Sequence, residues 1–238
     1  MESVNGTEII SCPNAQCGQQ LRVPAGEVLM VTCPSCEASF THRPQTQGKR
    51  LTQEFRTKSW TLGELVIAIS RESMTLLKRQ APHALGTLER KQEWEAFIEF
   101  LKVLFNMIDR IATLYIPVSE YLQFLDAVED AVIDQMNNAF RKQAGAGYDE
   151  TPLKVSIVAA FETAQKFYQH HRFMITDEGP DRDRYLMAFG EAVANTLGLK
   201  GNKMIVTTAS MCAGSSIAAI KALLESSEGR GSVPSGSA

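Results

Sequence analysis

Apolar side chains recur at helical spacing through most of the chain that follows Ser59. The pattern is clearest over 87–116, where large apolar residues occupy positions i, i+3, i+4 and i+7 in succession. Pro117 interrupts it, and a second apolar stripe follows at once over 121–140. Proline disfavours helical geometry in the residue before it, so one helix is expected to end here. Two long helices joined by so short a connection form either one kinked rod or an antiparallel hairpin, and we favour the hairpin.

The same spacing predicts four more helices, over about 59–81, 152–173, 182–197 and 205–224. The first is expected to start near Ser59 or Thr61, because Glu64 follows Thr61 in a capping-box pattern. In the second, Thr151 is the expected cap and Pro152 takes the first helical position.

The stretch 204–224 is about as long as a transmembrane helix and carries one charge, on Lys221. It also contains small polar residues, among them Thr207, Ser210 and Ser216, and few large apolar ones. These residues favour a buried or half-buried helix that packs closely against a neighbour. We therefore expect no membrane span.

The first 40 residues lack helical spacing, and short strands are expected at 22–23 and 28–32, around a turn over 24–27. The next segment is polar and basic: over 41–58, five basic residues stand against one acidic residue, a net charge of +4. The chain is thus predicted to be a small β unit followed by a mainly α helical-bundle domain. The expected boundaries are 1–42 for the β unit, 43–58 for a basic linker, 59–225 for the helical bundle and 226–238 for a disordered tail.

Four of the five cysteines lie in the β unit as two close pairs, Cys12 with Cys17 and Cys33 with Cys36. Zinc prefers four tetrahedral ligands, and two cysteines on one tight turn can supply two of them. The pairs therefore predict a bound zinc ion, with iron as an alternative that tetrahedral sulfur also suits. Free thiols and a redox dithiol are the other interpretations, but a redox dithiol would need a βαβ context that the sequence does not indicate. Four thiolates leave no open coordination position, so the metal is expected to be structural.

The cysteine region also resembles a known kind of small domain. Leu21-Arg22-Val23-Pro24, followed by Cys33-Pro34-Ser35-Cys36 and then Ser39-Phe40, is similar to the short zinc ribbons at the N-termini of many bacterial proteins. The resemblance implies a β zinc ribbon with cysteine ligands and extends over about 30 residues. It departs from the family pattern in the first pair, where CPNAQC has four intervening residues in place of two.

Net charge and the first ten residues limit the expected partners and location of the protein. The net charge of −3 over 238 residues does not indicate a polyanion-binding protein as a whole. The first ten residues have neither a basic region nor a long apolar stretch, so no secretory signal is expected. Together with close cysteine pairs, this favours a reducing cytoplasmic location.

No catalytic signature of the GxSxG, Walker A or GxGxxG kind occurs in the chain. His170 and His171 are adjacent and would point apart on a helix, and Cys212 is interpreted as buried filler. We favour a non-enzymatic adaptor that binds a protein partner, with the helical domain as a scaffold or homo-oligomerisation module. A nucleic-acid-binding regulator using the ribbon and basic linker is the alternative. An enzyme with a pocket between helices is the third hypothesis.

Overall fold

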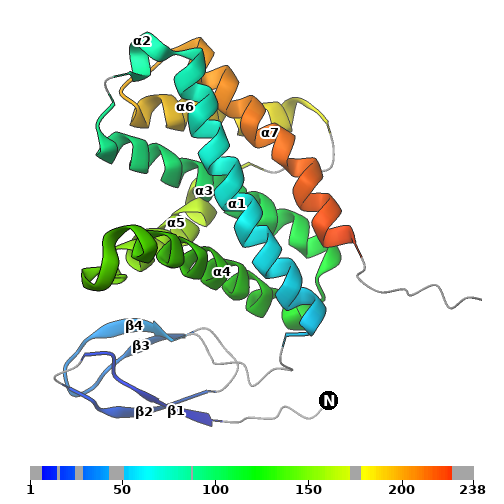
Figure 1. The fold of residues 1–238 in the computed structure, drawn as a ribbon. Coiled ribbons are helices and arrows are strands. Elements are labelled where there is room, and N and C mark those ends of the chain that lie inside the picture. The colour runs from blue at the N-terminus through cyan, green and yellow to red at the C-terminus, as the bar shows by residue number, and fades with distance from the viewer. Residues whose placement is uncertain are drawn as a thin grey trace, which may run out of the picture. The chain divides into compact units, whose positions relative to one another are not determined.

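The computed structural model describes residues 7–14, 17–24, 29–42, 51–86, 88–171 and 178–226. The chain divides into two compact units, residues 1–50 and 51–238, which are described separately (Figure 1). The first is a small β unit and the second is a bundle of helices, as the sequence predicts. Half of the expected linker, 43–50, and all of the expected tail after Ser226 lie outside the described residues.

The N-terminal unit consists of two antiparallel hairpins. Its strands are β1 (Thr7–Ser11), β2 (Gln20–Pro24), β3 (Leu29–Thr32) and β4 (Ser39–His42), with β1 paired to β2 and β3 paired to β4. The strands expected around one turn are present as β2 and β3, but they belong to different hairpins. Their partners, β1 and β4, were missed because each is a short stretch with little period-two alternation.

The described part of this unit has a very small core. Leu21 and Val23 point inward from alternate positions of β2, and Cys12 and Cys33 are buried beside them. Half-buried Val31 and Phe40, paired across β3 and β4, pack against this cluster. So few apolar groups cannot offset the entropy of ordering two hairpins, so the unit needs a further cross-link.

The second unit contains seven α-helices and one short 3₁₀ turn within its described residues. They are α1 (Gln53–Gln80), α2 (Pro82–Leu85), α3 (Arg90–Tyr115), α4 (Val118–Ala144), η1 (Gly145–Gly147), α5 (Thr151–Tyr168), α6 (Pro180–Thr196) and α7 (Lys203–Glu225). α3 runs through the middle and contacts α1, α5, α6 and α7 (Figure 1). α1 lies between α4 and α7 and contacts both.

The two long helices on either side of Pro117 fold back antiparallel, as expected. Near the connection, the Tyr121 hydroxyl lies against Asp109, and at the far end the rings of Trp94 and Phe140 are 6.3 Å apart. The most extensive contacts of α4 are nevertheless with α1, not with α3. Gly63 of α1 sits at that crossing, where an added Cβ would lie 3.0 Å from the Ala131 Cβ. α4 therefore packs against α1 as well as against its hairpin partner α3.

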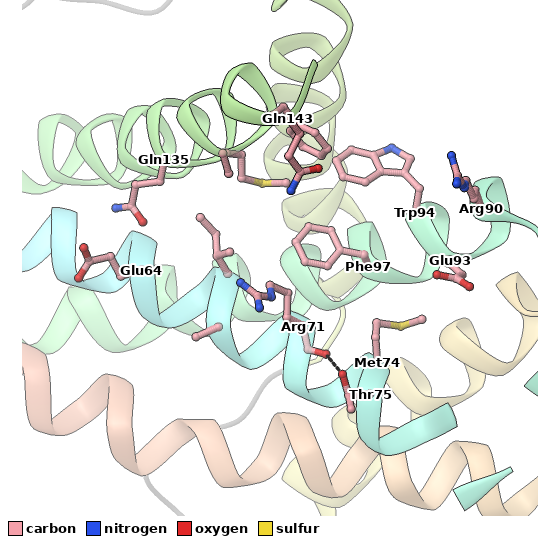
Figure 2. Close-up of a pocket in the computed structure, with 15 residues that line it drawn as sticks. Glu64, Arg71, Met74, Thr75, Arg90, Glu93, Trp94, Phe97, Gln135 and Gln143 are labelled. Atoms are coloured by element: carbon pink, nitrogen blue, oxygen red, sulfur yellow. Dashed lines mark hydrogen bonds between the residues drawn. The ribbon is translucent and has the colours of Figure 1, made fainter. Parts of the chain in front are cut away.

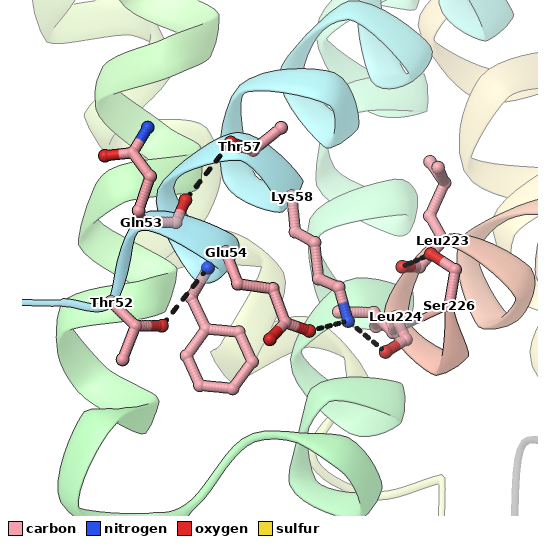
Figure 3. A network of polar contacts seen from close by, with 9 residues as sticks. Thr52, Gln53, Glu54, Thr57, Lys58, Leu223, Leu224 and Ser226 are labelled. Atoms are coloured by element: carbon pink, nitrogen blue, oxygen red, sulfur yellow. Dashed lines mark hydrogen bonds and ion pairs between the residues drawn. The ribbon is translucent and has the colours of Figure 1, made fainter. Parts of the chain in front are cut away.

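The start of α1 differs from the prediction. The helix begins at Gln53, where the Thr52 hydroxyl accepts a hydrogen bond from the Phe55 amide, so 53–58 is helix and not linker. Lys58 is buried; its Nζ donates to the Leu224 carbonyl oxygen at 2.9 Å and lies 2.9 Å from a Glu54 carboxylate oxygen (Figure 3). Lys58, one of the charges that suggested a solvated linker, is thus paired inside the helical unit.

Replacement of Lys58 by methionine tests this contact. Methionine keeps most of the apolar stem but leaves the Leu224 carbonyl without its charged donor at the end of α7. We expect the free energy of unfolding to fall by about 1–3 kcal/mol, measured by urea denaturation. Lys166→Met, at an exposed lysine of α5, is the matched control and should change stability by less than about 0.5 kcal/mol. Equal effects of the two substitutions would show that the buried contact does not stabilise the unit.

Two boundaries of α5 also differ from the prediction. Thr151 is already helical and does not cap; the Asp149 carboxylate accepts its amide hydrogen at 2.9 Å, and that bond lowers the pKa of Asp149. The helix ends at Tyr168, not near Phe173, so His170 and His171 lie beyond it. Histidines of a loop need not point apart, so the helical argument against a shared metal does not apply to them.

α6 and α7 pack unusually closely. Gly190 of α6 faces the Val206 carbonyl oxygen of α7, and an added Cβ would lie only 2.4 Å from it. The Ser210 hydroxyl lies 2.8 Å from the carbonyl oxygens of Leu186 and Val206. The expected close packing of the last helix is thus confirmed.

By length and composition alone, α7 is the one described helix that could cross a membrane. In the structure, residues such as Ile205, Ala209 and Ile220 are buried along one side of it. That side contacts α1, α3 and α6, so α7 serves as a core helix of the bundle.

Candidate metal centre

The two hairpins bring the four predicted cysteines together. Each pair lies in the loop of one hairpin, Cys12 and Cys17 between β1 and β2, and Cys33 and Cys36 between β3 and β4. All four Sγ atoms lie within 4.8 Å of one another. Within the described ranges, this is the one group of three or more His, Cys, Asp or Glu residues close enough to hold a metal ion.

The sulfur separations fit a metal and not disulfides. Cys12 Sγ lies 3.6 Å from Cys36 Sγ, and Cys17 Sγ lies 3.7 Å from Cys33 Sγ. A disulfide would require about 2.05 Å. Metal–sulfur bonds of about 2.3 Å in tetrahedral geometry place neighbouring sulfurs about 3.8 Å apart. Each of these short separations joins one cysteine from each hairpin, so a bound metal would cross-link the two hairpins.

The two cysteine loops are closed in the same way despite their different lengths. The Cys12 amide donates to the Gln19 carbonyl at 2.8 Å, and the Cys33 amide donates to the Ala38 carbonyl at 2.9 Å. The residue after the second cysteine has positive φ in both loops, +59° at Gly18 and +57° at Glu37. The longer loop of CPNAQC thus keeps the closing geometry of the shorter one.

Backbone amides surround the sulfurs. The Asn14, Gln19 and Ser35 amides, each two residues beyond a cysteine, hydrogen-bond to the sulfurs of Cys12, Cys17 and Cys33 respectively. Burial acts to raise the pKa of Cys33, but the amides of Ser35 and Cys36, together with hydrogen bonds to the Cys17 and Cys36 thiols, lower it to about 7. Amide hydrogens that point at a sulfur stabilise its thiolate, which is the form that binds metal.

Four cysteines this close together can all be thiolates only if a cation offsets their mutual repulsion. The Asn14 amide acts to lower the pKa of Cys12, but burial and the three neighbouring thiols raise it to about 12. Four thiolates this close repel one another in the absence of a positive ion. A divalent metal removes that repulsion, and the donor set therefore suits a metal ion held by all four sulfurs.

Cys212 is not part of this centre. It lies on α7 in the helical unit, half-buried, and burial raises the pKa of its thiol. A raised pKa is opposite to what a nucleophilic cysteine needs. The finding agrees with its interpretation as a packing residue.

A second candidate site is a groove of about 930 Å³ between α1, α3 and α4 (Figure 2). Its lining includes the half-buried aromatic side chains Trp94 and Phe97 and the charged side chains Arg71 and Arg90. Trp94 belongs to the apolar stripe over 87–116, whose spacing predicts a core residue and gives no sign of a groove. The groove depends on how three helices pack, and the spacing along one helix does not reveal that.

Comparisons with known proteins do not identify the chain. No protein-family model, no curated protein and no solved structure matches it. What the structure shows is a four-cysteine group able to hold a metal, in a small β unit ahead of a helical bundle. The function must therefore be inferred from these two features and the groove.

Proposed function

We propose that the protein is a zinc-binding adaptor that mediates protein–protein interaction and does not catalyse a reaction. The observation that carries this proposal is the closed set of four sulfurs, all within 4.8 Å of one another. Four thiolates complete the coordination sphere of zinc, so no position is left for water or substrate. The ion then acts as a structural cross-link that holds the surface of two small hairpins in shape.

Two features of the helical unit support an adaptor. It is a separate compact unit with its own core, and it has an open groove lined by aromatic side chains. Exposed or half-exposed aromatic side chains are enriched where proteins bind other proteins. A metal-stabilised head joined to a groove-bearing bundle gives one chain two places to hold partners.

The metal part of the proposal is tested by native mass spectrometry with elemental analysis. We expect one zinc per chain. One iron per chain, with the visible absorption of an iron–thiolate centre, would replace zinc by iron but keep the structural role. A folded N-terminal unit without any metal would overturn the proposal.

The adaptor part is tested by affinity purification of the full chain from the cells that express it, after chemical cross-linking. We expect specific co-purifying proteins, and those bound through the N-terminal unit should be lost in Cys33→Ser but retained in Cys212→Ser. Recovery of no protein above background, together with turnover of a substrate, would count against an adaptor.

The nucleic-acid-binding alternative has lost part of its basis. Lys58, one of the five basic residues in 41–58, is buried and bonded to the end of α7. The Arg56 side chain donates to the Leu51 carbonyl at 3.0 Å, although it remains exposed. A protein that binds nucleic acid through this run would show affinity for random DNA or RNA that weakens steeply with salt.

A further inference from the structure

The groove in the helical unit has the length of a short helix. Its α1 wall runs from Glu64 to Thr75, eleven residues along the helix, or about 16 Å (Figure 2). The opposite walls come from the first turns of α3 and the second half of α4. A helix of about three turns therefore matches the wall in length.

A row of aromatic rings lines one end of the groove. Phe97 and Trp94 stack at 5.5 Å, Trp94 meets Phe140 edge-on at 6.3 Å, and Phe140 stacks on Tyr148 at 6.1 Å. The row continues from the groove into a smaller hollow of about 310 Å³ beside the start of α5, which Trp94 and Phe140 also line. Phe140 is 37 % exposed, so this apolar surface is open to solvent.

The charges at the aromatic end are unbalanced. Glu93 is paired with Lys78 at 2.8 Å, and Glu64 lies at the other end, where it accepts a hydrogen bond from the Trp60 indole. Arg71, in the middle of the groove, and Arg90, beside Trp94, form no ion pair with any residue that the structure describes (Figure 2). Two exposed guanidinium groups beside an aromatic row are therefore available to carboxylates of a ligand.

We propose that this groove binds an acidic amphipathic helix of a partner protein. Apolar side chains at i, i+3 or i+4 and i+7 of the helix would pack against the aromatic row and the adjacent apolar wall. Asp or Glu residues flanking that apolar stripe would pair with Arg71 and Arg90. The inference rests on the proposed adaptor function and names the chemistry of the partner at this site.

A helix fits the groove better than a small molecule does. Ligand pockets usually enclose most of a small molecule's surface. Here Arg71 and Arg90 are exposed and Phe140 is partly so, which leaves one side of the groove in water. An amphipathic helix needs only one face buried and keeps its polar face in solvent, so an open groove suits it.

The test uses a displayed library of peptides about 14 residues long, which is about 21 Å of helix. The apolar positions are fixed in an i, i+3/i+4, i+7 pattern, the remaining positions are random, and selection is on the full metal-loaded chain. We expect the selected peptides to be enriched in Asp and Glu beside the apolar stripe. The double variant Arg71→Glu/Arg90→Glu should weaken their binding at least about tenfold, measured by fluorescence anisotropy.

The matched control is Arg79→Glu/Lys166→Glu, which makes the same charge change at exposed residues outside the groove lining and should alter binding less than about twofold. Selection of no peptide, or of peptides without acidic enrichment, would overturn the inference. Binding that is indifferent to Arg71→Glu/Arg90→Glu would also overturn it. So would tighter binding of decanoate, a small-molecule probe with an apolar chain and one carboxylate, than of every selected peptide. Cellular partners captured equally by that double variant and by the wild type would overturn the groove while leaving the adaptor function in place.

Discussion

Replacement of Cys33 by serine is expected to abolish metal binding and to unfold residues 7–42, while the helical unit keeps its thermal melting temperature. Cys33 is fully buried at the centre of the cysteine group, and its loss leaves three thiolates from two hairpins. Structural zinc sites of this kind contribute about 10–16 kcal/mol of apparent binding free energy, far more than so small an apolar core can supply. Hydrogen exchange measures the loss of protection in the strands, and circular dichroism measures the melting temperature of the helices.

Chelation of the metal from the wild-type protein should give the same result as the substitution, because both remove the link between the hairpins. Cys212→Ser is the matched control, since it removes the one cysteine outside the group and should retain one metal per chain. Amides of 7–42 that stay protected from exchange after the metal is gone would contradict the prediction. Simultaneous melting of the helices would contradict the independence of the two units.

Replacement of Gly190 by alanine is expected to lower the free energy of unfolding of the helical unit by about 2–3 kcal/mol, measured by urea denaturation. The new methyl group would lie 2.4 Å from the Val206 carbonyl oxygen and 2.6 Å from the Ser210 hydroxyl oxygen. The first contact is with backbone, so α6 and α7 must move apart. The gain in helix propensity from glycine to alanine, about 1 kcal/mol, offsets only part of the steric cost, and the expected loss of stability is the net of the two.

Gly214→Ala is the control at the same helix pair. There the added Cβ would lie 3.2 Å from the Leu186 Cδ1 atom, the end of a flexible side chain that can rotate away. We expect a change within about 1 kcal/mol of zero, because the propensity gain and a small steric cost have opposite signs. Equal stability of the Gly190 and Gly214 variants would show that the two helices are not held at the distance described.

Local signals in the sequence were the most informative. The cysteine spacing predicted the ligand group that the structure assembles, because two ligands on one tight turn need no knowledge of the rest of the fold. Helical periodicity and its interruption at Pro117 likewise predicted the hairpin, and the small residues of the last helix predicted its close packing. These predictions depend on residues that are near one another along the chain.

The predictions that failed depend on distant residues. Lys58 reads as part of a solvated basic run until the end of α7, more than 160 residues later, is placed beside it. Trp94 packs partly against the core, as its apolar stripe predicts, but the placement of α1 and α4 also makes it line an open groove. Neither burial nor exposure can be assigned from one helix when three helices share the surface.

The hydrogen bond between Lys58 and Leu224 also ties the two ends of the helical unit together. Its 2.9 Å separates the Lys58 Nζ, near the start of α1, from the Leu224 carbonyl oxygen in the last turn of α7 (Figure 3). Domains whose ends meet in this way tolerate circular permutation and insertion into a loop of another protein. The bundle can therefore be inserted as a domain into another protein, and segments fused before Thr52 or after Ser226 would start close to one another.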